Sequence, residues 1–212
     1  MKLTIFGATG GVGRQVVLQA LAAGHDVTAV VRDPARLPVA DAPGLTVAVV
    51  PDQTVAESLV APIAGSDAVI SGIGPSGARD GVAVAATRAV LGALATAGVS
   101  RFVAISAQPL GAVPPGEGLL GRLLVYPIVR FAFRHEYRQL AVMEADIGRS
   151  GAEWTVIRPP RLLDEPAAGP YRTATGGNVP NARTVSRAEV AQCMLAVLTD
   201  PTTIRQPVGV SR

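Results

Sequence analysis

The sequence predicts a single-domain α/β protein in which a doubly wound parallel sheet is covered by helices on both faces. Short apolar, β-branched segments recur along the chain, and longer alanine- and leucine-rich segments separate them. The short segments are continuously apolar and do not alternate with polar residues, which is typical of strands buried on both faces. A length of 212 residues suits one domain of 1–212.

Each expected strand is an apolar segment that ends at a glycine, a proline or a polar residue. We expect strands at residues 3–6, 27–31, 46–50, 68–71, 102–105 and 154–157, where residues of high strand propensity are enriched. We expect helices between and after them, at residues 12–23, 55–61, 78–97, 131–150 and 186–198. Gly24, Gly98 and Gly151 follow three of these helices, at the position where glycine most often ends a helix.

Two stretches lack a clear pattern. Residues 108–121 are rich in proline and glycine and are expected to form a loop after the fifth strand. Residues 159–185 are expected to form a small, irregular C-terminal extension before the last helix. Both stretches leave the carboxyl ends of strands, where ligands bind in open parallel sheets. We therefore interpret them as walls of a substrate pocket.

Composition excludes several classes of function. The chain has one cysteine, Cys193, and two histidines, His25 and His135, so no metal site is expected. The net charge of +3 is too small to favour nucleic acid as a partner. No apolar stretch reaches the ~20 residues of a membrane-spanning helix, and no cleavable signal is visible at Met1, so a cytoplasmic location is expected.

A glycine-rich turn follows the first expected strand and leads into the first helix. Its spacing is G-x-x-G-x-x-G, and glycine is needed where the backbone turns sharply and approaches a diphosphate at a helix N-terminus. This position in the chain predicts a Rossmann-like dinucleotide site. The candidate binding residues are Gly7, Thr9, Gly10, Gly11, Val12 and Gly13.

The end of the second strand indicates which dinucleotide binds. An arginine there accommodates the 2′-phosphate of NADP, whereas an acidic residue accepts hydrogen bonds from the ribose of NAD. Arg32 comes first and Asp33 follows, so NADPH is favoured and NADH stays open. Asp52 and Gln53, after the third strand, are expected to reach the adenine.

Gly72, Ile73 and Gly74 follow the fourth strand, where the glycines would let the backbone pass close to the second ribose and the nicotinamide. Ser106, at the end of the fifth strand, is the best polar candidate beside the nicotinamide. It could orient water or the cofactor amide, but a hydroxyl without a paired base is a poor acid.

These residues and several later stretches resemble the atypical short-chain dehydrogenase/reductase superfamily, in its NAD(P)H-binding, NmrA-like branch. Within that branch the chain is most similar to the biliverdin-IXβ reductase/flavin reductase group. The matching stretches are Gly7-Ala8-Thr9-Gly10 with Gly13, Val31-Arg32-Asp33 with Arg36-Leu37, Asp67-Ala68-Val69-Ile70, Ser106-Ala107, Ser150-Gly151, Pro159-Pro160, Asp164-Glu165-Pro166 with Gly169 and Tyr171, and Val185-Ser186-Arg187 with Glu189-Val190-Ala191.

The resemblance implies that a Rossmann domain holds NADPH and reduces flavins, tetrapyrroles or quinones. It implies that Arg32 binds the 2′-phosphate and that Ser106 stands beside the nicotinamide, with Ala107 and Pro159 as further cofactor contacts. The chain departs from the biliverdin reductase pattern at Arg161, where that pattern has a histidine. Arg161 could hold an anionic acceptor. Tyr137 and Tyr171 are further candidates for the substrate pocket.

The Tyr-x-x-x-Lys pair of most short-chain dehydrogenases cannot be present, because Lys2 is the only lysine and Tyr137 is followed four places later by Ala141. Losing a positioned acid commonly costs ~10² to 10⁴ in the rate of ketone reduction. Flavins and quinones need it less, since their reduced anions are delocalised and can take protons from water.

The sequence therefore predicts an NADPH-dependent reductase that transfers hydride to a small flavin-, quinone- or tetrapyrrole-like acceptor without a Tyr-Lys dyad. The alternative is a non-catalytic NAD(P)-sensing regulatory protein of the NmrA-like type. The apolar stretch 119–133 is interpreted as a lid or a dimer surface, which leaves a homodimer open.

Overall fold

A computed structural model describes residues 1–37, 39, 41–75, 81–114 and 116–212. Over these residues the main sheet has the order β3-β2-β1-β4-β5-β6-β10-β8, and β7 and β9 form a separate parallel pair. All neighbours in the main sheet are parallel except β8, which is antiparallel to β10. The strands are β1 Lys2–Phe6, β2 Asp26–Val31, β3 Leu45–Val49, β4 Ala68–Ser71, β5 Arg101–Ile105, β6 Glu153–Arg158, β7 Arg161–Leu163, β8 Arg172–Thr175, β9 Thr184–Ser186 and β10 Gln206–Ser211.

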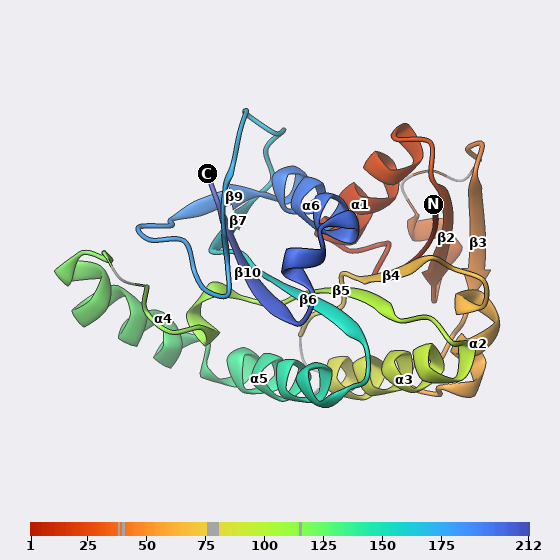
Figure 1. Ribbon diagram of the computed structural model, residues 1–212, viewed down its shortest axis with the longest axis horizontal. Coiled ribbons are helices and arrows are strands. Elements are labelled where there is room, and N and C mark those ends of the chain that lie inside the picture. Colours follow the sequence, from red (N-terminus) through yellow and green to blue (C-terminus); the bar gives the residue numbers. More distant parts are fainter. Residues whose placement is uncertain (38, 40, 76–80, 115) are drawn as a thin grey trace.

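Helices cover both faces of this sheet, as Figure 1 shows. One face carries α1 and α6, whose Val16 and Met194 are fully buried, and the other carries α2, α3 and α5, with Leu59 and Val90 fully buried. The helices are α1 Gly11–Ala22, α2 Glu57–Ile63, α3 Val82–Ala97, α4 Tyr126–Ala132, α5 Arg134–Arg149 and α6 Arg187–Ala196. The predicted doubly wound, Rossmann-like architecture is confirmed.

The direction of winding changes between β1 and β4. The chain moves outward from β1 through β2 to β3, and then outward on the other side from β4 through β5 to β6. In the β1–β4 pair Phe6 is opposite Ser71, so both strands end at the same level. A sheet that winds both ways leaves a crevice at this point, beyond the carboxyl ends of the strands.

Every expected strand is present, with its ends shifted by at most one residue. Two expectations about the strands and the C-terminal extension need correction. The strand β3 lies at the edge of the sheet and is only partly covered. The segment 159–185 is less irregular than predicted, because it contains β7, β8 and the start of β9.

The strand β10 was missed because its sequence carries Pro207 and Gly209, which normally argue against a strand. The glycine is required by packing: a Cβ at Gly209 would lie 2.7 Å from the carbonyl oxygen of Gly177. The backbone of residues 176–179 therefore passes too close for a side chain at that position.

The expected helix at 131–150 is divided. A helix begins at Leu119, runs through the π-helical turn Gly121–Val125 and α4, and is interrupted at Phe133 before α5. The expected loop therefore ends three residues early, at residue 118. The start of the expected helix at 78–97 lies outside the described residues, and α3 begins at Val82.

Within the part of the chain that is described, no helix has the length and apolar character to span a bilayer.

Candidate functional site

Three glycines bring β1, β4 and α1 together at the crevice. Gly7 has a φ of +68°, and a Cβ there would lie 2.7 Å from the carbonyl carbon of Gly72. A Cβ at Gly13 would overlap the carbonyl oxygen of Gly7. These positions accept only glycine without movement of the backbone, so the turn packs tightly against the end of β4.

The N-terminus of α1 faces this crevice without a side-chain cap. Gly10 occupies the N-cap position, its own N–H donates to the Gly7 oxygen (2.8 Å), and the first turn of the helix carries no acidic residue. The first N–H groups of α1, starting at Gly11 and Val12, therefore have no intrahelical acceptor. Together with the helix dipole they form a place suited to an anion such as a diphosphate.

Arg187, the first residue of α6, adds a positive charge at the same turn. A Cβ at Gly11 would lie 2.5 Å from Nε and 2.6 Å from Cδ of Arg187, so the arginine side chain occupies the space beside Gly11. Glycine at position 11, which the G-x-x-G-x-x-G spacing does not require, leaves room for the arginine in this position. Sequence reasoning missed Arg187 as a site residue, because 176 positions separate it from Gly11, which it contacts.

The start of α6 is held firmly, which fixes the position of Arg187. Ser186 and Glu189 form a capping box, and the buried Glu189 carboxylate also accepts from the Ala168 N–H (3.2 Å) and from Nε of Arg212 (3.1 Å). Burial would raise the pKa of Glu189, but these hydrogen bonds outweigh it and hold the pKa below its ordinary value. Nη1 of Arg187 lies 2.6 Å from Oδ1 of the exposed Asp164, so the arginine links the turn to the segment after β7.

At the end of β2, Arg32 is exposed and Asp33 is engaged locally. Oδ1 of Asp33 accepts a hydrogen bond from the Ala35 N–H (3.0 Å) and caps the 3₁₀ helix Pro34–Arg36. After β3, Oδ1 of Asp52 accepts from both the N–H and the hydroxyl of Thr54, and Nε2 of Gln53 donates to the Val30 oxygen (3.4 Å). Both side chains thus shape the turn next to the end of β2.

The structure places Ser106, Ala107 and Pro159 side by side at the ends of β5 and β6. The Ser106 N–H donates to the Ile157 oxygen (2.8 Å), and the Gln108 N–H donates to the Pro159 oxygen (2.9 Å). Ser106 is 8% exposed, yet its Oγ has no hydrogen-bond partner within the described part of the chain. A buried hydroxyl of this kind normally has a partner, so Oγ is available to a bound group.

Tyr137 of α5 joins this end of the site. It packs in one apolar cluster with Ile73, which follows β4, and with Ala107, which follows β5. Burial raises the pKa of Tyr137, and the neighbouring Glu136 raises it further, so the phenol is protonated at neutral pH. Gly74, one residue after Ile73, has open space where a side chain would be.

Arg161 and Tyr171 lie elsewhere. Arg161 begins β7 and is exposed. Tyr171 packs against the core beneath α1 and α6, on the face of the sheet opposite Tyr137. The structure therefore brings Ser106, Ala107, Pro159, Ile73 and Tyr137 together and leaves Tyr171 apart from them.

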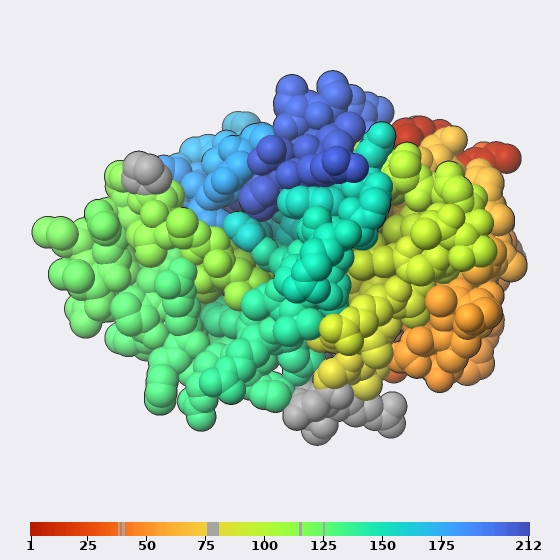
Figure 2. Space-filling view, turned by 60° about the horizontal axis from the view of Figure 1, so that its bottom comes forward, coloured from red at the N-terminus to blue at the C-terminus, as the bar shows by residue number. Residues whose placement is uncertain are grey.

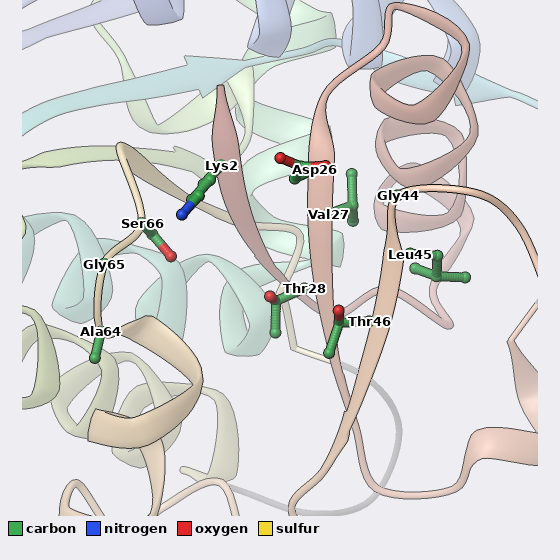
Figure 3. Close-up of a pocket in the computed structure, with 10 residues that line it drawn as sticks. All are labelled: Lys2, Asp26, Val27, Thr28, Gly44, Leu45, Thr46, Ala64, Gly65 and Ser66. Atoms are coloured by element: carbon green, nitrogen blue, oxygen red, sulfur yellow. The ribbon is translucent and has the colours of Figure 1, made fainter.

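A hollow of about 350 Å³ lies at the other end of the sheet. It is bordered by the amino ends of β1, β2 and β3, and Lys2, Asp26 and Ser66 lie around it in Figure 3. The only lysine of the chain is thus remote from Ser106 and Tyr137, which stand at the carboxyl ends. Over the described residues no three His, Cys, Asp or Glu side chains gather as a metal site, and Cys193 is buried.

A profile for a family described as NAD(P)H-binding matches residues 7–201, from the glycine turn to beyond α6. The chain belongs to the NAD(P)H-binding family. Its nicotinamide cofactor fits the cradle described above, since the uncapped helix N-terminus, the glycines and Arg187 suit a diphosphate and the unpartnered Ser106 Oγ suits a polar group further along the crevice.

Relatives of this NAD(P)H-binding protein share nearly its whole length. The uncharacterized protein YwnB of Bacillus subtilis is 28% identical over 206 residues, which cover 93% of this chain and 91% of YwnB. A short-chain dehydrogenase/reductase from Veillonella parvula, solved in complex with NADP, has a TM-score of 0.80 at 19% identity and covers 100% of this chain and 94% of its own. ChuY, an anaerobillin reductase from Escherichia coli O157:H7, has a TM-score of 0.74 at 25% identity, with 100% and 97% covered.

Proposed function

We propose that this protein is an NADPH-dependent oxidoreductase that transfers hydride to a flavin-, quinone- or tetrapyrrole-like acceptor. The observation that carries the proposal is the glycine turn with an uncapped helix N-terminus, against which the Arg187 side chain lies. This combination supplies N–H donors and a fixed positive charge where a diphosphate would lie. The reductase ChuY and the NADP complex from Veillonella parvula support the same assignment by their fold.

The cofactor would lie along the carboxyl ends of β1, β2, β4 and β5. The N–H groups at the start of α1 and Arg187 would hold the diphosphate, and the residues after β4 and β5 would border the nicotinamide. The proposed cofactor residues are Gly7, Thr9, Gly10, Gly11, Val12, Gly13, Arg32, Asp52, Gln53, Gly72, Ile73, Gly74, Ser106, Ala107, Pro159 and Arg187.

We propose NADPH in preference to NADH because of the side chains after β2. Arg32 and Arg36 are both exposed there and can approach a 2′-phosphate. Asp33, the acidic residue that would favour NADH, already caps the next helical turn through Oδ1. Arg32 and Arg36 are therefore both available to bind the 2′-phosphate, whereas the Asp33 carboxylate is engaged with the Ala35 N–H.

The bound cofactor would supply a hydride. The proposed role of Ser106 is to donate or accept a hydrogen bond that fixes the nicotinamide amide or a water molecule, because its Oγ is buried and unpartnered among the described residues. Tyr137 would offer a protonated phenol and an apolar surface to a flat acceptor, and Arg161 would attract an anionic one. Tyr171 would contribute only by packing the wall that carries β7.

A single kinetic comparison tests the proposal. The purified protein is mixed with NADPH and either FMN or menadione, and the loss of NADPH absorbance is followed. We expect consumption of NADPH that depends on the acceptor and falls in Ser106→Ala. Tight NADPH binding with no turnover against any of these acceptors would favour the NAD(P)-sensing regulator, and absence of binding would contradict both functions.

A further inference from the structure

A helical arm, residues 119–133, projects from the layered body of the protein. Figure 1 shows α4 at one end of the molecule, outside the two helical layers, and Figure 2 shows the same green segment forming the left-hand end of the surface. It joins the loop after β5 to α5. Its projection from the body makes it accessible to a partner.

The arm exposes large apolar side chains to an unusual degree. Leu119, Leu123 and Phe131 are 76%, 71% and 71% exposed. Elsewhere in the described chain, exposed large apolar residues do not exceed the 53% of Val49. The exposed apolar residues of the arm are Leu119, Leu120, Leu123, Leu124, Ile128, Phe131 and Phe133. A contiguous apolar surface of this kind marks an interaction site.

The arm is anchored to the body by specific contacts, so its exposed side is defined. The buried Tyr126 hydroxyl accepts from Nε2 of Gln108 (2.8 Å). Arg130 donates from Nε to the Pro109 oxygen (2.8 Å) and from Nη2 to the Gly111 oxygen (2.9 Å). These bonds hold the inner side of the arm to the loop after β5, and the leucines and phenylalanines are left facing outward.

The charges of the arm identify the partner. Between Glu117 and Glu136 every charged side chain is an arginine, and the three are Arg122, Arg130 and Arg134. The guanidinium of Arg134 lies over the ring of Phe131 at 4.9 Å, so charge and apolar surface are adjacent. Arg130 is held to the body, so Arg122 and Arg134 are the arginines beside the outward apolar face. Two arms packed together would bring four such arginines near one another with no acidic residue between them, which disfavours a second copy and favours an anionic surface.

We infer that the arm docks on an anionic lipid bilayer. In this arrangement the helix lies in the interfacial plane, the leucines and phenylalanines enter the boundary of the acyl chains, and Arg122 and Arg134 meet lipid phosphates. The two requirements of interfacial binding, exposed apolar side chains and basic residues beside them, are both met within residues 119–134. The inference does not depend on the proposed cofactor or acceptor.

Vesicle flotation with the full-length protein tests this inference. We expect the protein to float with phosphatidylcholine vesicles that contain phosphatidylglycerol and much less with pure phosphatidylcholine, and added salt should weaken binding. Leu120→Ser/Leu124→Ser should lower the partition coefficient about tenfold or more, since two inserted side chains are lost. Arg122→Gln should lower it about fivefold on the anionic vesicles alone.

Matched variants outside the arm serve as controls. Val49→Ser/Val55→Ser removes exposed apolar side chains on β3 and before α2, and Arg183→Gln removes an exposed charge before β9; both should bind vesicles as the wild type does. Thermal unfolding shows that each variant is folded. The inference is overturned if the wild-type protein does not bind anionic vesicles, or if the arm variants bind them as strongly as the wild type does. It is also overturned if light scattering shows that the wild type is a dimer and that the arm variants are monomers.

Discussion

Replacing Arg187 with glutamine removes the positive charge that lies beside the diphosphate-binding turn without adding volume. A charge-assisted hydrogen bond to phosphate contributes about 1.5–3 kcal/mol. Binding must draw Arg187 away from Asp164, whose side chain is 84% exposed, and such an exposed pair is worth at most about 1 kcal/mol. With that pair deducted in full, the net loss is about 0.5–2 kcal/mol, which weakens binding about two- to thirtyfold.

The pattern across coenzymes distinguishes Arg187 from Arg32. The diphosphate is common to NADPH and NADH, so Arg187→Gln should weaken both by the same factor, whereas Arg32→Gln should weaken NADPH alone. Asp164→Asn should leave binding unchanged or tighten it slightly, because a competing carboxylate is removed. Fluorescence titration with each coenzyme measures these constants, with Arg183→Gln as the control.

An Arg187→Gln protein that binds both coenzymes as the wild type does would refute this account of the turn. A selective loss of NADPH would also refute it, because Arg187 would then contact the 2′-phosphate and not the diphosphate.

The remaining predictions concern stability and reactivity. Gly13→Ala should destabilise the protein by about 1–3 kcal/mol in urea unfolding, because its Cβ overlaps the Gly7 oxygen, whereas Gly148→Ala on the open side of α5 should be neutral or stabilising. The Glu189 carboxylate has a lowered pKa, so its contribution to stability is present at neutral pH and is lost as the pH falls below about 4; the gap in unfolding free energy between wild type and Glu189→Gln should shrink over that range. Burial raises the pKa of the Cys193 thiol to about 12, so it should not react with a thiol reagent until the protein unfolds, and reaction in the native state would contradict its placement.

The elements that sequence predicted well are those whose local pattern agrees with their final environment. The central strands β1, β4 and β5 are continuously apolar and are buried on both faces. The glycine turn was also readable, because its spacing lies between a strand and a helix. The strand β10 was not, since Pro207 and Gly209 argue against a strand, and the need for glycine at 209 comes from the close approach of residues 176–179.

Candidate site residues could be predicted from the sequence where they directly follow a strand. Arg32, Ser106 and the residues after β4 could be named as candidates because each follows a recognisable strand. Arg187 was not found, because its contact with Gly11 depends on how α6 packs beside α1. The additional glycine at position 11 is the one sequence feature that relates to this contact. It points to Arg187 only when the structure shows that the Arg187 side chain lies beside it.

Isothermal titration of the wild-type protein with NADPH and with NADH tests the central claim most directly. We expect one NADPH to bind per chain, with NADH weaker by about tenfold or more because it lacks the phosphate that Arg32 and Arg36 would hold. The claim is contradicted if neither coenzyme gives a heat of binding, or if the two coenzymes bind with equal affinity.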